Sequence, residues 1–181
     1  YTRIRIAAAL LICASMATLH ASALDAASGL KKGDVELKSI GPIAFGPDQI
    51  LFVSDPKATA VYAIQLKRDR QAPGKSFDIT GLDAKAAAMI GVNTSDIILQ
   101  DLALDTHSGS AYLSISRGRG PDAMPILLRA TADGNIEILD LKNVPHAKVE
   151  LWSLPGKDRR GRERQMDAIT EIAYADDHVI V

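Results

Sequence analysis

Three stretches of the sequence share one pattern: an apolar run, a short turn that contains aspartate, and a second apolar run. They read IAFGPDQILFV at 43–53, DLALDTHSGSAYLSI at 101–115 and TEIAYADDHVIV at 170–181. Short runs rich in Ile, Val, Leu and Tyr between such turns are typical of antiparallel β-strands. The recurring pattern therefore predicts a mainly β chain.

The strands around these stretches are predicted to form a unit of four that restarts along the chain. The first unit is expected at 39–45, 50–55, 60–66 and 76–80, the second at 96–105, 110–116, 125–132 and 135–141, and a third at 166–175 and 178–181. Repetition of a four-stranded meander is typical of a β-propeller. A β-sandwich is the alternative, but it does not require the same four-strand order to restart.

The fold predicted from this repetition is all-β, a partial β-propeller of about two and a half four-stranded antiparallel blades with a short inserted helix. Blade one is expected over about 35–80, blade two over about 96–142, and the start of blade three over about 166–181. Since a ring closes with roughly four to eight blades, the sequence is interpreted as a fragment of a six- or seven-bladed ring.

Two insertions separate the predicted blades. The insertion at 82–95 carries an Ala-rich stretch for which Asp83 is the expected N-cap and Gly91 the expected stop, so it predicts a helix. The segment 144–165 is expected to be a long loop, and its KDRRGRER run is interpreted as a solvated surface.

Residues 1–23 have the three regions of a secretory signal peptide: two arginines, a short apolar run, and an Ala-Ser-Ala triplet. A buried N-terminal helix is the alternative. The signal peptide predicts an exported protein, periplasmic or extracellular, without a stable membrane anchor after cleavage. It would also remove Cys13, the sole cysteine. The formal net charge of −1 argues against nucleic acid as the partner.

Blade geometry predicts where a ligand would bind. In an antiparallel meander, the residues before the first strand and after the second strand lie at the same rim. The residues predicted to form a ligand rim there are Asp55, Asp101, Arg117, Arg119 and Asp122.

The segment SRGRGPDA at 116–123 is the most specific part of that rim. Two glycines alternate with two arginines, which suits a tight loop that directs guanidinium groups and backbone N–H groups toward an anion. The alternative is structural, with Arg117 and Arg119 paired to Asp101 or Asp122.

No catalytic or metal-ligating residues are assigned. The sequence contains no G-x-S-x-G, P-loop, G-x-G-x-x-G or H-E-x-x-H pattern. The recurring carboxylates Asp48, Asp105 and Asp176 are interpreted as turn residues, because aspartate accepts backbone hydrogen bonds in tight turns.

From residue 40 onward, IAFGPDQILFVSD and DLALDTHSGSAYLSIS resemble the blades of the NHL-repeat, strictosidine-synthase-like and gluconolactonase-like propellers. In the gluconolactonase-like members, a Glu directly before the first-blade Gly-Pro ligates a divalent metal. Here Ile40 precedes Gly41, so that ligand is absent. The chain is also similar to uncharacterised exported bacterial propeller proteins that keep the SRGRGPDA segment, which implies a shared site.

These observations lead to two functional hypotheses. The first is an exported binding or interaction module whose rim binds a small anion, with the small-molecule or protein ligand unknown. The second is a metal-dependent hydrolase of the lactonase or strictosidine-synthase-like kind. It would need a divalent cation in the channel, and the residues present do not supply its ligand set.

Overall fold

The computed structural model describes residues 29–67, 79–151, 156–161 and 164–181. Within these ranges the chain consists mainly of antiparallel β-sheets, with one α-helix, so the predicted all-β class is confirmed. The predicted signal peptide, Cys13 and most of the predicted strand at 76–80 lie outside the described residues.

The first sheet has five antiparallel strands. In spatial order they are β1 (Lys31–Gly33), β9 (Val144–Glu150), β4 (Ala60–Gln65), β3 (Ile50–Asp55) and β2 (Ile43–Phe45). The prediction that 144–165 is a loop is therefore wrong at its start, because 144–150 pairs with both β4 and β1. β9, which follows the strands of the second sheet in the sequence, therefore belongs to the first sheet.

The second sheet contains the four strands expected between 96 and 141, in the expected order. They are β5 (Ile97–Asp105), β6 (Ser110–Arg117), β7 (Met124–Ala130) and β8 (Ile136–Ile138). β6 is the central strand, and its side chains from Ser110 to Ser116 are all buried. The third sheet consists of β10 (Ala173–Ala175) and β11 (His178–Ile180).

The turns follow the local sequence closely. Asp176 and Asp177 join β10 to β11 with φ of 49° and 62°. Positive φ at both central positions is the conformation of a type I′ hairpin turn, which aspartate tolerates. Five short 3₁₀ turns complete the connections: η1 (Pro47–Gln49), η2 (Pro56–Ala58), η3 (Thr94–Asp96), η4 (Gly120–Asp122) and η5 (Gln165–Asp167).

The predicted helix is present as α1 (Leu82–Ile90). It ends as expected at Gly91, whose φ of 75° gives the left-handed C-cap. Its start differs from the prediction, because Gly81 occupies the N-cap position and Asp83 lies inside the first turn. There the carboxylate still interacts favourably with the helix dipole.

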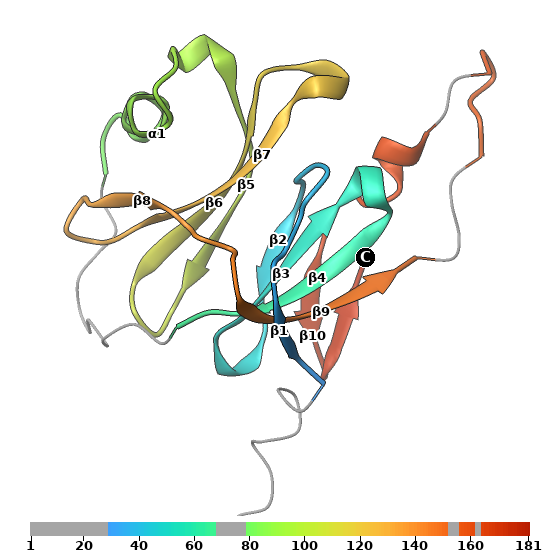
Figure 1. Cartoon of the computed structure of the whole chain (residues 1–181), viewed down its shortest axis with the longest axis horizontal. Coiled ribbons are helices and arrows are strands. Elements are labelled where there is room, and N and C mark those ends of the chain that lie inside the picture. The colour runs from blue at the N-terminus through green and yellow to red at the C-terminus, as the bar shows by residue number, and fades with distance from the viewer. Residues whose placement is uncertain (1–28, 68–78, 152–155, 162–163) are drawn as a thin grey trace, which may run out of the picture.

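The elements stack face to face in the order α1, second sheet, first sheet, third sheet (Figure 1). Leu51 and Ile64 of the first sheet pack with Tyr112 of the second, and Tyr112 meets Phe45 edge to face with ring centroids 5.1 Å apart. On the other face of the first sheet, Phe52 stacks on Tyr174 at 5.7 Å. The third sheet therefore packs on the first one and not on the second.

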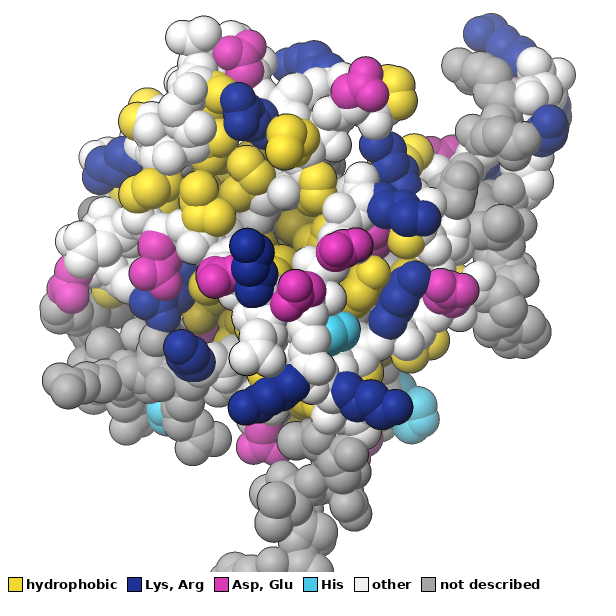
Figure 2. All heavy atoms as spheres, in the orientation of Figure 1, with side chains coloured by type: hydrophobic (Ala, Val, Ile, Leu, Met, Phe, Trp, Pro, Cys, Tyr) yellow, Lys and Arg dark blue, Asp and Glu magenta, His cyan; other side chains and the backbone are white. Residues whose placement is uncertain are grey.

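Large apolar side chains remain exposed at both ends of this stack. On the second sheet, Leu102 and Leu104 of β5 lie opposite Leu113 and Ala111 and so share the face on which α1 packs. Figure 2 shows hydrophobic side chains gathered over this part of the molecule. At the other end, Val149 is 63% exposed beside β11. Neither outer surface is fully covered within the described residues.

Candidate functional site: a cleft between the first two sheets

A cleft of about 720 Å³ lies between one end of the first sheet and the adjacent end of the second. Its walls come from residues 39–42, Pro56 and Lys57 of the first sheet's loops, and from Ile98, Gln100, Ser116, 118–121 and Ala123 of the second. Met166, Ile169 and Thr170 close a third side. The loops after β3 and after β6 therefore meet at a common rim, as the meander geometry predicts.

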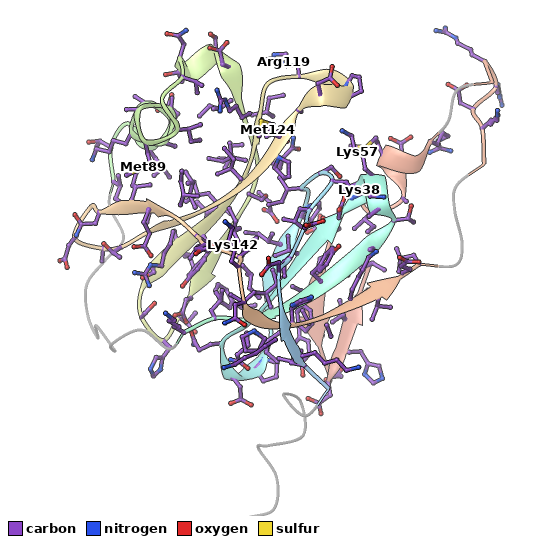
Figure 3. All side chains as sticks on the ribbon, viewed as in Figure 1. Lys38, Lys57, Met89, Arg119, Met124 and Lys142 are labelled. Atoms are coloured by element: carbon purple, nitrogen blue, oxygen red, sulfur yellow. The ribbon has the colours of Figure 1, made fainter. Side chains whose placement is uncertain are left out.

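Lys57 joins the two sides of this rim. It lies in the turn η2, and its Nζ donates a hydrogen bond to the carbonyl oxygen of Pro121 in the loop after β6. Figure 3 shows Lys57 and Lys38 at the end of the first sheet that faces the loop carrying Arg119. The sequence interpretation missed Lys57, because a single lysine in a Pro-Lys-Ala turn resembles any solvated surface lysine.

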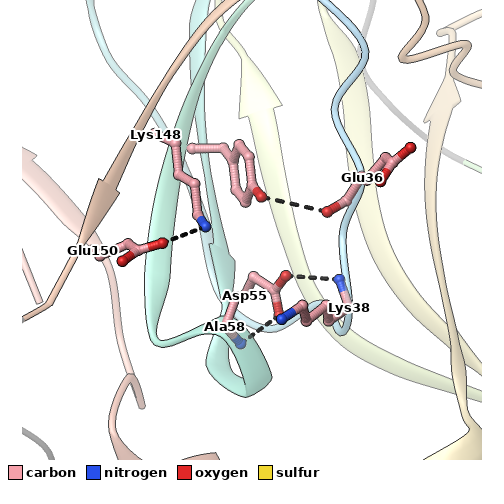
Figure 4. A network of polar contacts seen from close by, with 7 residues as sticks. Glu36, Lys38, Asp55, Ala58, Lys148 and Glu150 are labelled. Atoms are coloured by element: carbon pink, nitrogen blue, oxygen red, sulfur yellow. Dashed lines mark hydrogen bonds and ion pairs between the residues drawn. The ribbon is translucent and has the colours of Figure 1, made fainter.

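Asp55 does not line the cleft. The residue is completely buried at the end of β3, and its carboxylate accepts hydrogen bonds from Lys38 N at 2.7 Å and from Ala58 N at 3.1 Å (Figure 4). It also accepts hydrogen bonds from Ser39 N at 2.9 Å and from Ser39 Oγ at 2.7 Å. Ser39 Oγ in turn accepts a hydrogen bond from Lys57 N at 2.9 Å. The contacts of Asp55 are therefore structural, because its carboxylate holds the turn that presents Lys57, and its ligand role stays a prediction from the sequence.

Asp101 also makes structural contacts. It follows a bulge in β5, where the register with β6 shifts between Leu99 and Asp101. One carboxylate oxygen accepts a hydrogen bond from Leu102 N at 2.7 Å, and the other accepts one from Ile43 N at 2.9 Å. Since β2 is an edge strand of the first sheet, Asp101 satisfies an outward backbone N–H group and ties the two sheets together. It does not line the cleft.

The loop after β6 depends on its glycines. Gly118 and Gly120 have φ of 83° and 73°, values that a residue with a Cβ adopts only with strain. Gly118 N donates to the carbonyl oxygen of Asp96 at 2.6 Å, which fixes the start of the loop. The sequence pattern of alternating glycine and arginine thus corresponds to a tight loop, as predicted.

The loop places its two arginines differently. Ser116 lines the cleft, so Arg117, the next residue of the same strand, points to the opposite face of the sheet. Arg119 lies beyond Gly118 and lines the cleft, while Asp122 is exposed and does not. In the described part of the chain, neither arginine forms a side-chain hydrogen bond or an ion pair, so pairing with Asp101 or Asp122 is not observed.

The polar lining of the cleft has one sign of charge. Among the described residues, its charged side chains are Lys57 and Arg119, and no carboxylate lines it. Gln100 and Ser116 add an amide and a hydroxyl, linked by a hydrogen bond of 3.0 Å from Gln100 Nε2 to Ser116 Oγ. This set can bind an anion by charge and by hydrogen-bond donation.

Asp48, Asp105 and Asp176, interpreted from the sequence as turn residues, lie in turns or directly beside them. Asp105 is buried at the end of β5 and accepts hydrogen bonds from Ser108 Oγ at 2.6 Å, from His107 N at 2.9 Å and from Gln49 Nε2 at 3.3 Å. Burial by itself would raise the pKa of Asp105, but these hydrogen bonds outweigh it and hold the pKa below its ordinary value. Asp105 therefore stabilises the β5–β6 turn and links it to the first sheet.

No group of three or more His, Cys, Asp and Glu side chains within the described ranges has the arrangement of a metal site. The metal-dependent hydrolase thus stays a prediction from the sequence. The helix that the structure describes is too short to cross a membrane.

No family model matches the sequence, and no curated protein or solved structure is found to be similar to it. The resemblance to NHL-like and gluconolactonase-like propellers therefore stays a prediction, and the chemistry of the cleft is argued from its own residues.

Proposed function

We propose that this chain is a binding module that holds a small anionic ligand in the cleft between the first two sheets. The observation that carries the proposal is the charge of the lining: Arg119 and Lys57 face the cleft, and no described carboxylate does. Arg119 has no hydrogen-bond or ion-pair partner among the described residues, and an arginine can form two parallel hydrogen bonds to a carboxylate or a phosphate.

The surroundings strengthen the attraction of these cations for an anion. All three sides of the cleft carry apolar side chains, and two of these, Ile40 and Ile169, are almost completely buried. Charges beside apolar walls interact more strongly than charges in open water, because less solvent screens them. The backbone of the Gly-rich loop is held in one conformation, so little ordering is needed on binding.

The proposal also concerns how the three sheets are arranged within the all-β fold and what the segment 1–23 does. We propose that the three sheets are blades of a β-propeller and that the segment 1–23 directs export. Two observations support the propeller: the sheets stack face to face, and β2 lies in contact with both β5 and β10, as the innermost strands of blades around a channel would. In this proposal the second and third blades flank the first, because the second and third sheets pack on opposite faces of the first sheet.

The experiment that tests anion binding compares two arginines that are two residues apart. Inorganic phosphate is titrated into the purified chain and binding is followed by calorimetry. Arg119→Ala should weaken binding by about tenfold to a hundredfold, because a hydrogen bond to a charged group is worth about 1.5 to 3 kcal/mol. Binding should also weaken as the salt concentration rises.

The matched control is Arg117→Ala, which removes an exposed arginine that lies at the end of β6, two residues from Arg119, and does not line the cleft. It should leave the affinity unchanged. If phosphate does not bind, or if the two variants lose affinity equally, the proposed anion site is wrong.

A further inference from the structure

The apolar lining of the cleft is far larger than a site that binds an inorganic anion through two cations would require. Its apolar members come from all three sides: Ile40, Pro42 and Pro56 from the first sheet, Ile98 from the second, and Met166 and Ile169 from the segment before β10. An inorganic anion is held by charges and hydrogen-bond donors and buries no apolar surface of its own against such walls. The apolar surface therefore needs an explanation of its own.

The size of the cleft also indicates a ligand larger than an inorganic anion. Sites for small organic molecules have volumes of roughly 300 to 1,000 Å³, and this cleft has about 720 Å³. A single phosphate or carboxylate group at Arg119 would leave most of that space to water. A ligand that fills the cleft must extend well beyond its charged group.

The two cations lie on facing walls of the cleft, one from each sheet. Lys57 Nζ bonds to the carbonyl oxygen of Pro121, two residues beyond Arg119, so both charges belong to the contact between η2 and the loop after β6. Met166 and Ile169 come from η5 and the chain that follows it, on another side. The lining is thus divided between two cations and apolar side chains that come from all three sides.

From this division we infer that the ligand is an amphipathic organic anion: a carboxylate or phosphate ester that binds Arg119 and Lys57 and carries an apolar body that packs on Ile98, Met166 and Ile169. This inference rests on the proposed function and specifies its ligand class. Met166 suits such a role because a flexible, polarisable side chain adapts to the shape of an apolar ligand.

Three probes separate the charged end from the apolar body: inorganic phosphate, naphthyl phosphate and uncharged naphthol. Naphthyl phosphate should bind at least about tenfold more tightly than inorganic phosphate, since the aromatic body removes apolar area from water on both sides. Naphthol should bind more weakly than naphthyl phosphate, because it lacks the charge that Arg119 and Lys57 attract.

Two methionines provide the matched pair of variants. Met166 and Met124 are 53% and 57% exposed, so neither side chain is part of the core, but only Met166 lines the cleft. Met166→Ser should weaken the binding of naphthyl phosphate several-fold and leave inorganic phosphate unaffected. Met124→Ser should change neither affinity.

The outcomes distinguish the inference from the proposed function. If naphthyl phosphate binds no more tightly than inorganic phosphate, or if Met166→Ser has no effect on it, the amphipathic ligand is ruled out while the anion site stands. If inorganic phosphate does not bind, or if naphthol binds as tightly as naphthyl phosphate, the proposed anion site itself is overturned.

Discussion

At the scale of single residues, the aspartates of this chain support structure more than chemistry. Asp55 and Asp101 each accept a backbone hydrogen bond from a segment distant in the sequence. Asp105 accepts a backbone hydrogen bond within its own turn and a side-chain hydrogen bond from the distant Gln49. A carboxylate that accepts several hydrogen bonds is held in one position and leaves few lone pairs for a ligand. This explains why acidic residues near a rim, which the sequence marks as ligand candidates, form the frame of the cleft instead.

The buried carboxylate of Asp55 should be one of the most sensitive positions in the chain. Asp55→Asn replaces an acceptor oxygen with an NH₂ group that faces backbone N–H donors, so we expect a loss of about 2 to 4 kcal/mol in the free energy of unfolding. Urea denaturation measures it. Asp122→Asn, at an exposed aspartate, is the control and should stay within about 0.5 kcal/mol of the unmodified chain. Equal stability of the two variants would contradict the structural role of Asp55.

Asp105 should make the stability depend on pH. Because its pKa is lower in the folded chain than its ordinary value of 3.8, its contribution is fully present above that pH. The contribution is lost as the pH falls through the folded pKa. The difference in unfolding free energy between the unmodified chain and Asp105→Asn should therefore be larger at pH 7 than at about pH 2.5. A difference that grows on acidification would show that the sign is wrong.

At the scale of elements, the helix α1 packs on the second sheet through one of its faces. Ala86 is buried against Leu113 and Ile115 of the second sheet, whereas Ala84 on the same helix is exposed. Ala86→Asp would place a carboxylate among apolar side chains and should cost more than about 3 kcal/mol. Ala84→Asp, in the first turn, should be nearly neutral. Thermal unfolding of the two variants tests the contact, and a similar melting temperature for both would mean that α1 does not pack there.

The elements also show what the sequence can predict. β3, β4 and β6 are apolar runs between turn residues, and α1 is Ala-rich and ends at a glycine, so local patterns are sufficient for them. β9 reads VPHAKVE, which contains a proline and three polar side chains, and it is a strand because β4 and β1 pair with it across long sequence separations. No local pattern reports such pairing.

The same limit applies to the cleft. The meander geometry predicts which loops meet, and the alternating Gly and Arg residues predict a tight cationic loop. Which arginine faces the cleft depends on where β6 ends, and the role of Lys57 depends on a contact with Pro121 that lies 64 positions away. These are properties of the packed sheets, so the sequence alone ranked Arg117 and Arg119 equally.

At the scale of the whole molecule, the stack of sheets leaves apolar surface at both ends. Leu104 lies on the outer side of the second sheet and is 51% exposed, and Val149 lies at the opposite end. β5 and β11 are also edge strands. Exposed apolar surface next to strand edges favours association through new strand pairing and apolar contact.

We therefore expect the chain to self-associate as its concentration rises, and sedimentation velocity over a dilution series measures this. The variant Leu104→Lys with Val149→Lys should shift the distribution toward monomer, because charges at strand edges and on apolar patches oppose association. Its melting temperature should change little, since both side chains are exposed. Leu113→Lys is the contrasting variant: Leu113 is buried under α1, so this lysine should unfold the second sheet and increase aggregation. A monomeric chain that melts cooperatively at high concentration would show that these surfaces do not drive association.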